Sequence, residues 1–258
     1  MVSVSISDIS QYIKEQFNSI NEQRIEHLKK FELNDILITK NPYLFNVKNV
    51  LITHDFVIRL LDEYMSLKEE TLLGNFLEGL AIFVNEKTYK GWKSVTQGID
   101  LEFNKEKTRY IVAIKSGPNW GNSSQIRKMQ DDFRKAKQTI RTSNSKLHVI
   151  AVNGCCYGRN TKPDRGDYYK YCGQKFWEFI SGNPALYIEI IKPLGYSIKE
   201  NNADFLEEYA KKVNIMTQEF SNLFVTNGMI DWESLVQFNS AENKPKLKAK
   251  QSSRVKKK

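Results

Sequence analysis

The sequence predicts a mixed α/β protein in which a helical N-terminal portion precedes a core of helix, strand, strand, helix and strand. Three observations support this prediction. Apolar residues recur at three- and four-residue steps over the first third of the chain, which is the period of a helix that faces a core. Near residue 100 the period changes to two, as in a strand. Two short apolar runs, separated by a polar segment of helical length, follow.

The first third of the chain predicts three helices. Residues 5–32 predict a long amphipathic helix, and Asn41-Pro42 predicts a break after it. Residues 54–66 predict a second helix and residues 68–84 a third. The third helix has a broad apolar face, and Glu78 lies within that face instead of on a charged stripe.

The middle of the chain predicts two strands joined by a hairpin. The stretch GIDLEF at residues 98–103 alternates apolar and acidic residues, so we expect Asp100 and Glu102 to share one face of a strand. Residues 104–108 predict a hairpin turn, and residues 110–114 predict the next strand. That strand lacks full alternation, which indicates burial on both faces.

The second half of the core predicts a helix and a third strand. We expect Ser123 or Ser124 to cap a helix that extends to about Arg141. Residues 146–152 predict a strand that Asn153-Gly154 ends, and the chain from Trp177 onward predicts mostly helices.

We expect three regions along the chain, and the middle one contains the αββαβ core. Residues 1–67 form a helical N-terminal region packed on the core. Residues 68–235 form the core and a helical C-terminal part, and residues 236–258 form a basic tail without fixed structure.

The composition indicates a globular protein outside the membrane and the secretory pathway. The chain has 258 residues, 40% of them apolar, which suffices for a sizeable core. Its longest apolar runs are far short of the ~20 residues that span a bilayer, and its N-terminus lacks a signal-peptide pattern. We therefore expect a cytoplasmic protein. The three cysteines, an odd number, predict reduced thiols instead of a disulfide framework.

The positive charge of the chain is concentrated at its C-terminus. The net charge is +9, but residues 244–258 hold eight lysines and arginines and no acid. Without them, 31 of the 39 basic residues remain against 30 acidic residues. The tail is either an arm that attracts nucleic-acid phosphates at low salt or a solubilising end.

Asp100 and Lys115 carry the clearest chemical signal in the sequence. Hydrolysis of a phosphodiester requires an activated water and stabilisation of the charge that develops on the phosphate. Carboxylates on adjacent strands can hold Mg²⁺, and a nearby lysine can orient the water. The predicted hairpin is short enough to bring Asp100 and Lys115 together.

This arrangement resembles the PD-(D/E)XK nuclease superfamily, and especially its type II restriction endonucleases. Ile99-Asp100 stands where that family has Pro-Asp, and Ala113-Ile114-Lys115 stands where it has acid-x-Lys. The stretches LLGNFLEGLAIFV, GIDLEF, IVAIKSGPNWGNSSQ, VNGCCYGR and CGQKFWEFISGNPALY resemble one branch of these enzymes over about residues 40–195. The resemblance implies a restriction-endonuclease-like αββαβ core with a mixed central sheet. It also implies Mg²⁺-dependent cleavage of duplex DNA at a short palindrome by a homodimer.

The resemblance also implies roles for individual residues. Asp100 and a second carboxylate would bind Mg²⁺, and the carbonyl group of Ile114 would add a ligand. Lys115 would position the attacking water or help to deprotonate it.

Ala113 departs from the family pattern, because an acid is expected at this position. The acid could have moved to another element. Glu78 is the first candidate, and Asp131 and Asp132 come next. Glu102 is a further candidate because we expect it to share a strand face with Asp100. A small residue at 113 would leave room for a carboxylate from a neighbouring helix. The alanine could instead be an engineered inactivation, or the protein could be a natural pseudonuclease.

Two loops are candidates for DNA contact. The loop of residues 116–125 offers polar side chains and precedes a helix N-terminus, which favours an anion; a rigid structural turn that Trp120 packs is the alternative. The loop of residues 157–171 mixes basic residues with tyrosines and is either a groove contact or a solvated surface. The candidate contacts are Ser116, Asn119, Asn122, Ser123, Ser124, Gln125, Arg127, Lys128 and Arg159.

Three functions remain open from the sequence. The first is a type II restriction endonuclease. The second is an inactive DNA-binding protein of the same fold, which binds a specific sequence and never nicks it. The third is a repair nuclease that selects DNA by its structure.

Overall fold

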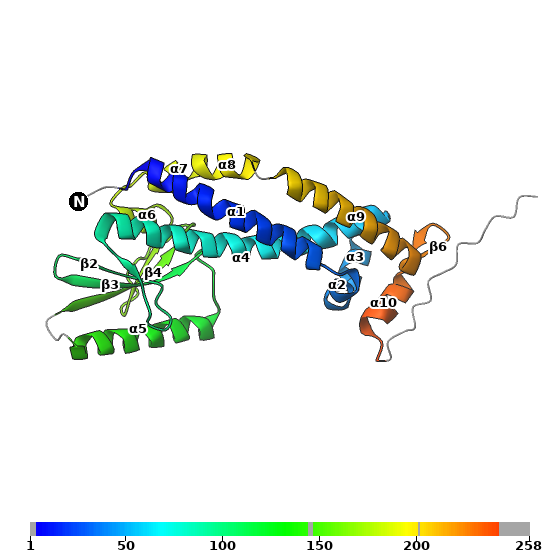
Figure 1. Cartoon of the computed structure of the whole chain (residues 1–258). Coiled ribbons are helices and arrows are strands. Elements are labelled where there is room, and N and C mark those ends of the chain that lie inside the picture. Colours follow the sequence, from blue (N-terminus) through cyan, green and yellow to red (C-terminus); the bar gives the residue numbers. More distant parts are fainter. Residues whose placement is uncertain (1–3, 144–146, 201, 243–258) are drawn as a thin grey trace, which may run out of the picture. The chain divides into compact units, whose positions relative to one another are not determined.

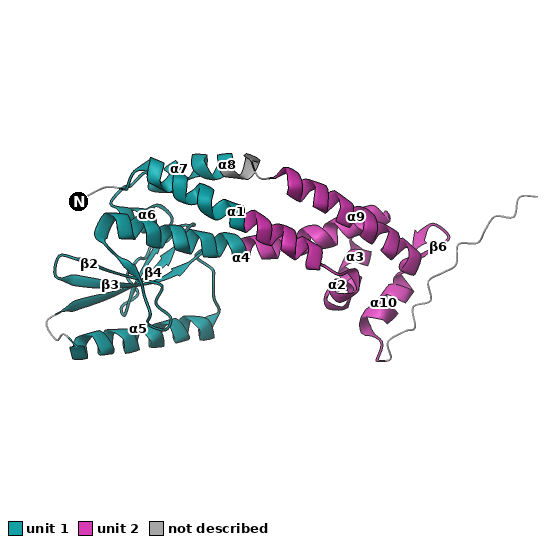
Figure 2. Ribbon diagram, in the orientation of Figure 1, with its two compact units in different colours: residues 1–19, 71–200 teal, residues 20–70, 201–258 magenta. Residues whose placement is uncertain are grey.

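The computed structural model describes residues 4–143, 147–200 and 202–242. The chain divides into two compact units, shown in Figure 2. Residues 1–19 and 71–200 form what we call the α/β unit, and residues 20–70 and 201–258 form the helical unit. The basic stretch 244–258 lies outside the described residues.

The α/β unit contains a five-stranded mixed sheet (Figure 1). Its spatial order is β1-β2-β3-β4-β5; the first three strands pair antiparallel, and the last three pair parallel. This confirms the expected mixed α/β fold. The strands are β1 (Trp92–Lys93), β2 (Leu101–Lys105), β3 (Thr108–Lys115), β4 (His148–Cys155) and β5 (Tyr169–Cys172).

Helices cover both faces of this sheet. In Figure 1, α4 (Thr53–Tyr89) runs over one face and α5 (Ser123–Ser143) over the opposite face. The polar-looking helix α5 directs Met129 and Phe133 into one buried cluster with Ile111 and Ala113 of β3. The remaining helices of this unit are α6 (Gln174–Ser181), α7 (Leu186–Glu189) and α8 (Ile191–Glu200).

Two predicted boundaries are wrong. The helices expected over 54–66 and 68–84 are one helix, α4, because no proline or other breaker separates them. Strand β4 continues through Asn153-Gly154 to Cys155. Asn153 is buried and hydrogen-bonded to β3, and Gly154 leaves space for the Phe176 ring, since a Cβ atom there would lie 2.2 Å from a ring carbon.

The helical unit has a core of its own. Parts of α1 (Ile6–Lys30) and α4 belong to each unit, so both helices are continuous across the division (Figure 2). The other elements of the helical unit are α2 (Leu33–Thr39), α3 (Pro42–Val47), α9 (Ala203–Phe224), β6 (Val225–Thr226), β7 (Met229–Ile230) and α10 (Trp232–Ser240). Helix α10 extends into the region from residue 236 onward that we expected to be a tail. Within the described ranges, no helix is both long and apolar enough to cross a membrane.

Phe56 lies at the centre of the helical core. Its side chain is 1% exposed. Its ring centroid is 5.0 Å from that of Phe45, 4.6 Å from that of Phe220 and 5.9 Å from that of Trp232. One residue therefore joins α3, α4, α9 and α10.

Replacing Phe56 tests this packing. We expect Phe56→Ala to lower the free energy of unfolding by about 3–5 kcal/mol, because truncation leaves a cavity among four helices. Phe56→Leu, which retains most of the volume, should cost less than about 1.5 kcal/mol. Urea denaturation followed by circular dichroism measures both, and equal midpoints for the two variants would contradict the packing.

Candidate active site

Asp100 is anchored just before β2 by three hydrogen bonds. Its main-chain N–H donates to the carbonyl oxygen of Val112 (2.9 Å), and its own carbonyl accepts from the N–H of Ser94 (3.1 Å). Its carboxylate Oδ2 accepts a 2.6 Å hydrogen bond from the main-chain N–H of Ile114. The expectation that Asp100 lies within a strand beside Glu102 is wrong, since β2 begins at Leu101.

Lys115 ends β3 and lies beside Asp100. Its Nζ atom is 3.8 Å from Asp100 Oδ2, and the two side chains are 32% and 23% exposed. At this distance the charges attract without a direct hydrogen bond. The structure therefore brings together the two residues that the sequence singled out, at a place that solvent reaches.

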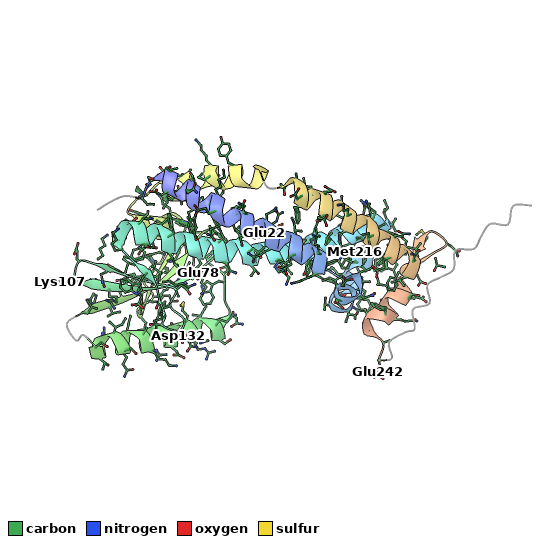
Figure 3. The ribbon with its side chains drawn as sticks, in the orientation of Figure 1. Glu22, Glu78, Lys107, Asp132, Met216 and Glu242 are labelled. Carbon is green, nitrogen blue, oxygen red and sulfur yellow. The ribbon has the colours of Figure 1, made fainter. Side chains whose placement is uncertain are left out.

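Glu78 lies on α4, which comes close to the residue after β3 at Gly74. A Cβ atom on Gly74 would lie 2.6 Å from the Oγ atom of Ser116, the residue after Lys115. Glu78 follows Gly74 by four residues and so lies on the same face of the helix. Figure 3 labels Glu78 on this helix, over the sheet. In the sequence, Gly74 is the residue that could have indicated this close approach of the helix.

The pKa of Glu78 shows that its carboxylate shares the electrostatic environment of Asp100 and Lys115. Burial raises this pKa above its ordinary value, and the negative charge of Asp100 raises it further. The positive charges of Lys93 and Lys115 act in the opposite direction. Glu78, Asp100 and Lys115 thus form one cluster, contributed by α4, the residue before β2 and the end of β3.

The other acids considered in place of Ala113 have partners elsewhere. Glu102 accepts a 2.7 Å hydrogen bond from Ser94 Oγ and lies 3.8 Å from Arg109. Asp132 is buried on α5 (Figure 3), and its carboxylate lies 3.2 Å from Lys128 Nζ. Asp131, on the same helix, is exposed and pairs with Arg134. Among these candidates, the structure places Glu78 in the field of Asp100.

Ala113 is part of the packing between the sheet and α5. It is 1% exposed and belongs to the buried cluster that α5 completes. Its carbonyl oxygen accepts a 3.2 Å hydrogen bond from Asn153 Nδ2. Glu78 comes from α4, on the opposite face of the sheet (Figure 1). The small side chain at 113 therefore packs against α5, and the room that it leaves lies on the α5 side of the sheet and not on the side of α4 and Glu78.

The cluster offers oxygen donors that suit a divalent cation. Among the residues that the structure describes, no three His, Cys, Asp or Glu side chains are grouped as metal ligands. The carboxylates of Asp100 and Glu78 are close enough to repel, which a cation between them would relieve. Carboxylate oxygens are the ligands that Mg²⁺ prefers in proteins.

The loop after Lys115 is built around Asn122. Asn122 Oδ1 accepts 3.1 Å hydrogen bonds from the N–H groups of Ser124 and Gln125, and so caps α5. Gln125 Oε1 accepts the N–H of Asn122 in return (2.9 Å). The cap is therefore Asn122 and not Ser123 or Ser124, because its side chain reaches two free N–H groups of the first turn.

Most of the predicted DNA contacts are exposed. Ser116 is half-buried against Gly74, whereas the other members of the set are exposed: Asn119, Asn122, Ser123, Ser124, Gln125, Arg127, Lys128 and Arg159. Arg159 borders a cavity of about 710 Å³ that Leu77, Cys156 and Trp177 also line.

The two candidate loops pack against each other. A Cβ atom on Gly117 would lie 2.4 Å from the ring of Tyr157, and one on Gly158 would lie 2.6 Å from the Pro118 ring. Lys170 Nζ donates a 2.7 Å hydrogen bond to the carbonyl oxygen of Pro118. Sequence reasoning missed this use of Lys170, because nothing local indicates a contact across 52 residues.

The three cysteines are buried and free. Burial, with a further contribution from the Glu78 charge, raises the pKa of Cys156 to about 12. Burial also raises the pKa of the Cys155 thiol. Thiols with such pKa values are poor nucleophiles at neutral pH, which agrees with the expected reduced, structural role.

The raised pKa of Glu78 predicts that this residue destabilises the fold at neutral pH. An acid with a folded-state pKa above its unfolded value is ionised at a cost above both values, and the cost disappears below the unfolded pKa of about 4.3. We therefore expect Glu78→Gln to raise the Tm at pH 7.5 in the absence of divalent cations. The gain should vanish near pH 4.

Glu86→Gln provides the matched control. Glu86 lies on the same helix and is exposed, so its substitution should leave the Tm unchanged at both pH values. Scanning calorimetry in EDTA measures all three proteins. An unchanged or lower Tm for Glu78→Gln at pH 7.5 would contradict the electrostatic cluster.

A comparison with known families identifies the family of the chain. The model of the family described as type II restriction endonuclease EcoO109I matches residues 7–202, which is more than half of the chain. The matched range contains Glu78, Asp100, Ala113 and Lys115. No curated protein matches the chain. On the extent of the family match, the chain belongs to the type II restriction endonuclease EcoO109I family.

Proposed function

We propose that the protein cleaves duplex DNA at a short palindromic site, as a homodimer and with Mg²⁺ held by Asp100 and Glu78. The family match supports type II restriction endonuclease activity in general, with DNA as the substrate. The observation that carries the specific proposal is the three-residue cluster. In it, Lys115 Nζ lies 3.8 Å from Asp100, and the Asp100 charge raises the pKa of Glu78.

The residues of this cluster have separable tasks. Bound Mg²⁺, held by the two carboxylates and the Ile114 carbonyl group, would act as a Lewis acid and lower the pKa of a bound water. Asp100 has one carboxylate oxygen fixed by the Ile114 N–H, so its other oxygen points in a set direction. An ammonium group offers only donors, so Lys115 orients the attacking water and stabilises negative charge on the phosphate.

The loop of residues 116–125 supports a contact to DNA through donors. The side-chain oxygens of Asn122 and Gln125 are used in the cap, so these amides face a substrate through their NH₂ groups. Such donors match phosphate oxygens and the acceptor atoms of purines. Exposed Arg127 and Arg159 add positive charge for the phosphate backbone.

The palindromic site and the homodimer belong together in this proposal. A twofold symmetric dimer presents the same surface twice, so it matches a DNA sequence that reads the same on both strands. Two clusters of the kind formed by Asp100 and Lys115 would then cut one strand each.

An inactive DNA-binding protein of the same fold is the second candidate. The observation that favours it is Ala113, which is buried where the family pattern has an acid. Such a protein would bind a specific duplex in EDTA and leave it intact with Mg²⁺.

Digestion of a mixed-sequence plasmid with Mg²⁺ separates the functions. We expect discrete fragments from the unaltered protein. Smears or cuts confined to branched DNA would indicate a structure-selective nuclease, and intact DNA would indicate the inactive protein.

In the same assay, Asp100→Asn and Glu78→Gln should each lower the cleavage rate by at least about 100-fold, because each removes a carboxylate from the cluster. Gel-shift binding in EDTA should persist.

Asp131→Asn is the matched control for these two variants. Asp131 is exposed and pairs with Arg134 on α5, so its substitution should leave cleavage unchanged. Cleavage by Glu78→Gln at the rate of the unaltered protein would remove Glu78 from the site.

The origin of Ala113 can be tested by restoring an acid. We expect Ala113→Glu to give no strong increase in cleavage, because Glu78 supplies the second carboxylate and residue 113 lies in the buried cluster against α5. The variant should also be less stable, since it buries a carboxylate. A gain above about tenfold would instead support an engineered inactivation; Ala113→Asp serves as a shorter comparison.

A further inference from the structure

The ammonium group of Lys115 has a second neighbour besides Asp100. Its Nζ atom lies 5.5 Å from the centroid of the Trp120 ring. This is within the distance at which a cation is attracted by the face of an aromatic ring. Trp120 comes from the loop after β3, five residues beyond Lys115.

The Trp120 ring is held by a buried asparagine. The indole Nε1–H donates a 3.1 Å hydrogen bond to Asn153 Oδ1. Asn153 is 1% exposed, and its Nδ2 donates to the carbonyl oxygen of Ala113 (3.2 Å). An asparagine that is bonded at both ends of its amide cannot turn without losing a buried hydrogen bond, which makes it a rigid support.

The position of Ala113 is part of this support. Ala113 and Asn153 are register partners on the parallel strands β3 and β4, so their side chains lie side by side on one face of the sheet. Trp120 packs against the buried cluster that contains Ala113. The methyl group therefore leaves space beside Asn153 for the indole, on the same face as Lys115.

The loop that carries Trp120 is fixed on both sides of the ring. Lys170 holds the carbonyl oxygen of Pro118, and Asn122 caps α5. Without the ring, a lysine side chain that is 32% exposed would sample many rotamers, and fixing such a side chain costs conformational freedom. The loop thus supplies a pre-positioned surface for the ammonium group.

We propose that Trp120 and Asn153 are positioning residues that hold the Lys115 ammonium group beside Asp100 for phosphodiester cleavage. The role in cleavage rests on the proposed function, whereas the placement of Lys115 rests on the contacts alone. Asn153 holds Trp120, and Trp120 holds Lys115.

The placement is tested without any activity measurement. In protein labelled with ¹³C-lysine, the ring current of Trp120 should shift the Lys115 ε-methylene protons upfield, and Lys115→Met identifies their signal. In Trp120→Leu and in Asn153→Ala, the signal should move to the position of exposed lysines. Trp92→Leu, which removes the ring 5.1 Å from Arg109, should leave it in place.

The effect on cleavage is tested under single-turnover conditions. We expect Trp120→Leu and Asn153→Ala to lower the rate constant about 5- to 10-fold, as loss of one cation–ring contact implies, with DNA affinity in EDTA unchanged. Trp120→Phe, which retains a ring, should recover part of the rate. Circular dichroism checks that each variant is folded.

The outcomes separate the two proposals. An unshifted Lys115 signal in Trp120→Leu, or an equal loss of rate and DNA affinity, would overturn the positioning role. Unaltered protein that shows the shifted signal but never cleaves DNA would support the placement and refute the proposed function.

Discussion

The hydrogen bond from the Ile114 N–H to the Asp100 carboxylate is the contact on which the candidate site depends. It is 2.6 Å long and joins Asp100, the residue before β2, to Ile114, the last residue but one of β3. An interaction with an ionised acceptor is stronger than an ordinary backbone hydrogen bond. It determines which carboxylate oxygen remains available, and it brings Lys115 within ion-pair distance. The loop after β3, with Trp120, then continues from a fixed point.

The proposed second carboxylate depends on tertiary packing. Glu78 feels the charges of Asp100 and Lys115 from α4, which approaches Ser116 closely at Gly74. Two acids near one another, one of them partly buried, are unfavourable in the absence of a cation. Such a raised pKa is common at functional sites, where stability is given up for reactivity. Glu102 and Asp132 instead lie in ion pairs with Arg109 and Lys128.

The sequence was sufficient for the elements with strong local signals. The αββαβ order, the hairpin between β2 and β3, and the pairing of Asp100 with Lys115 follow from periodicity and a short connection. The continuity of α4 and the extension of β4 through Asn153 were missed, since each depends on contacts far along the chain. The link from Trp120 to Asn153 spans 33 residues and has no local pattern. Periodicity cannot report which face of the sheet a helix covers, so it could not tell that Ala113 faces α5 and not α4.

In the proposed site, the close approach at Gly74 changes which positions evolution can alter. Position 113 lies among apolar side chains against α5, so selection there acts on volume and not on charge. Position 74 carries no reactive group, yet any larger side chain would meet Ser116 Oγ. A substitution at 74 would therefore require the Ser116 hydroxyl group to turn away, or a smaller residue at 116. The constraint of an active site has in this way passed to a glycine 41 residues from Lys115 along the chain.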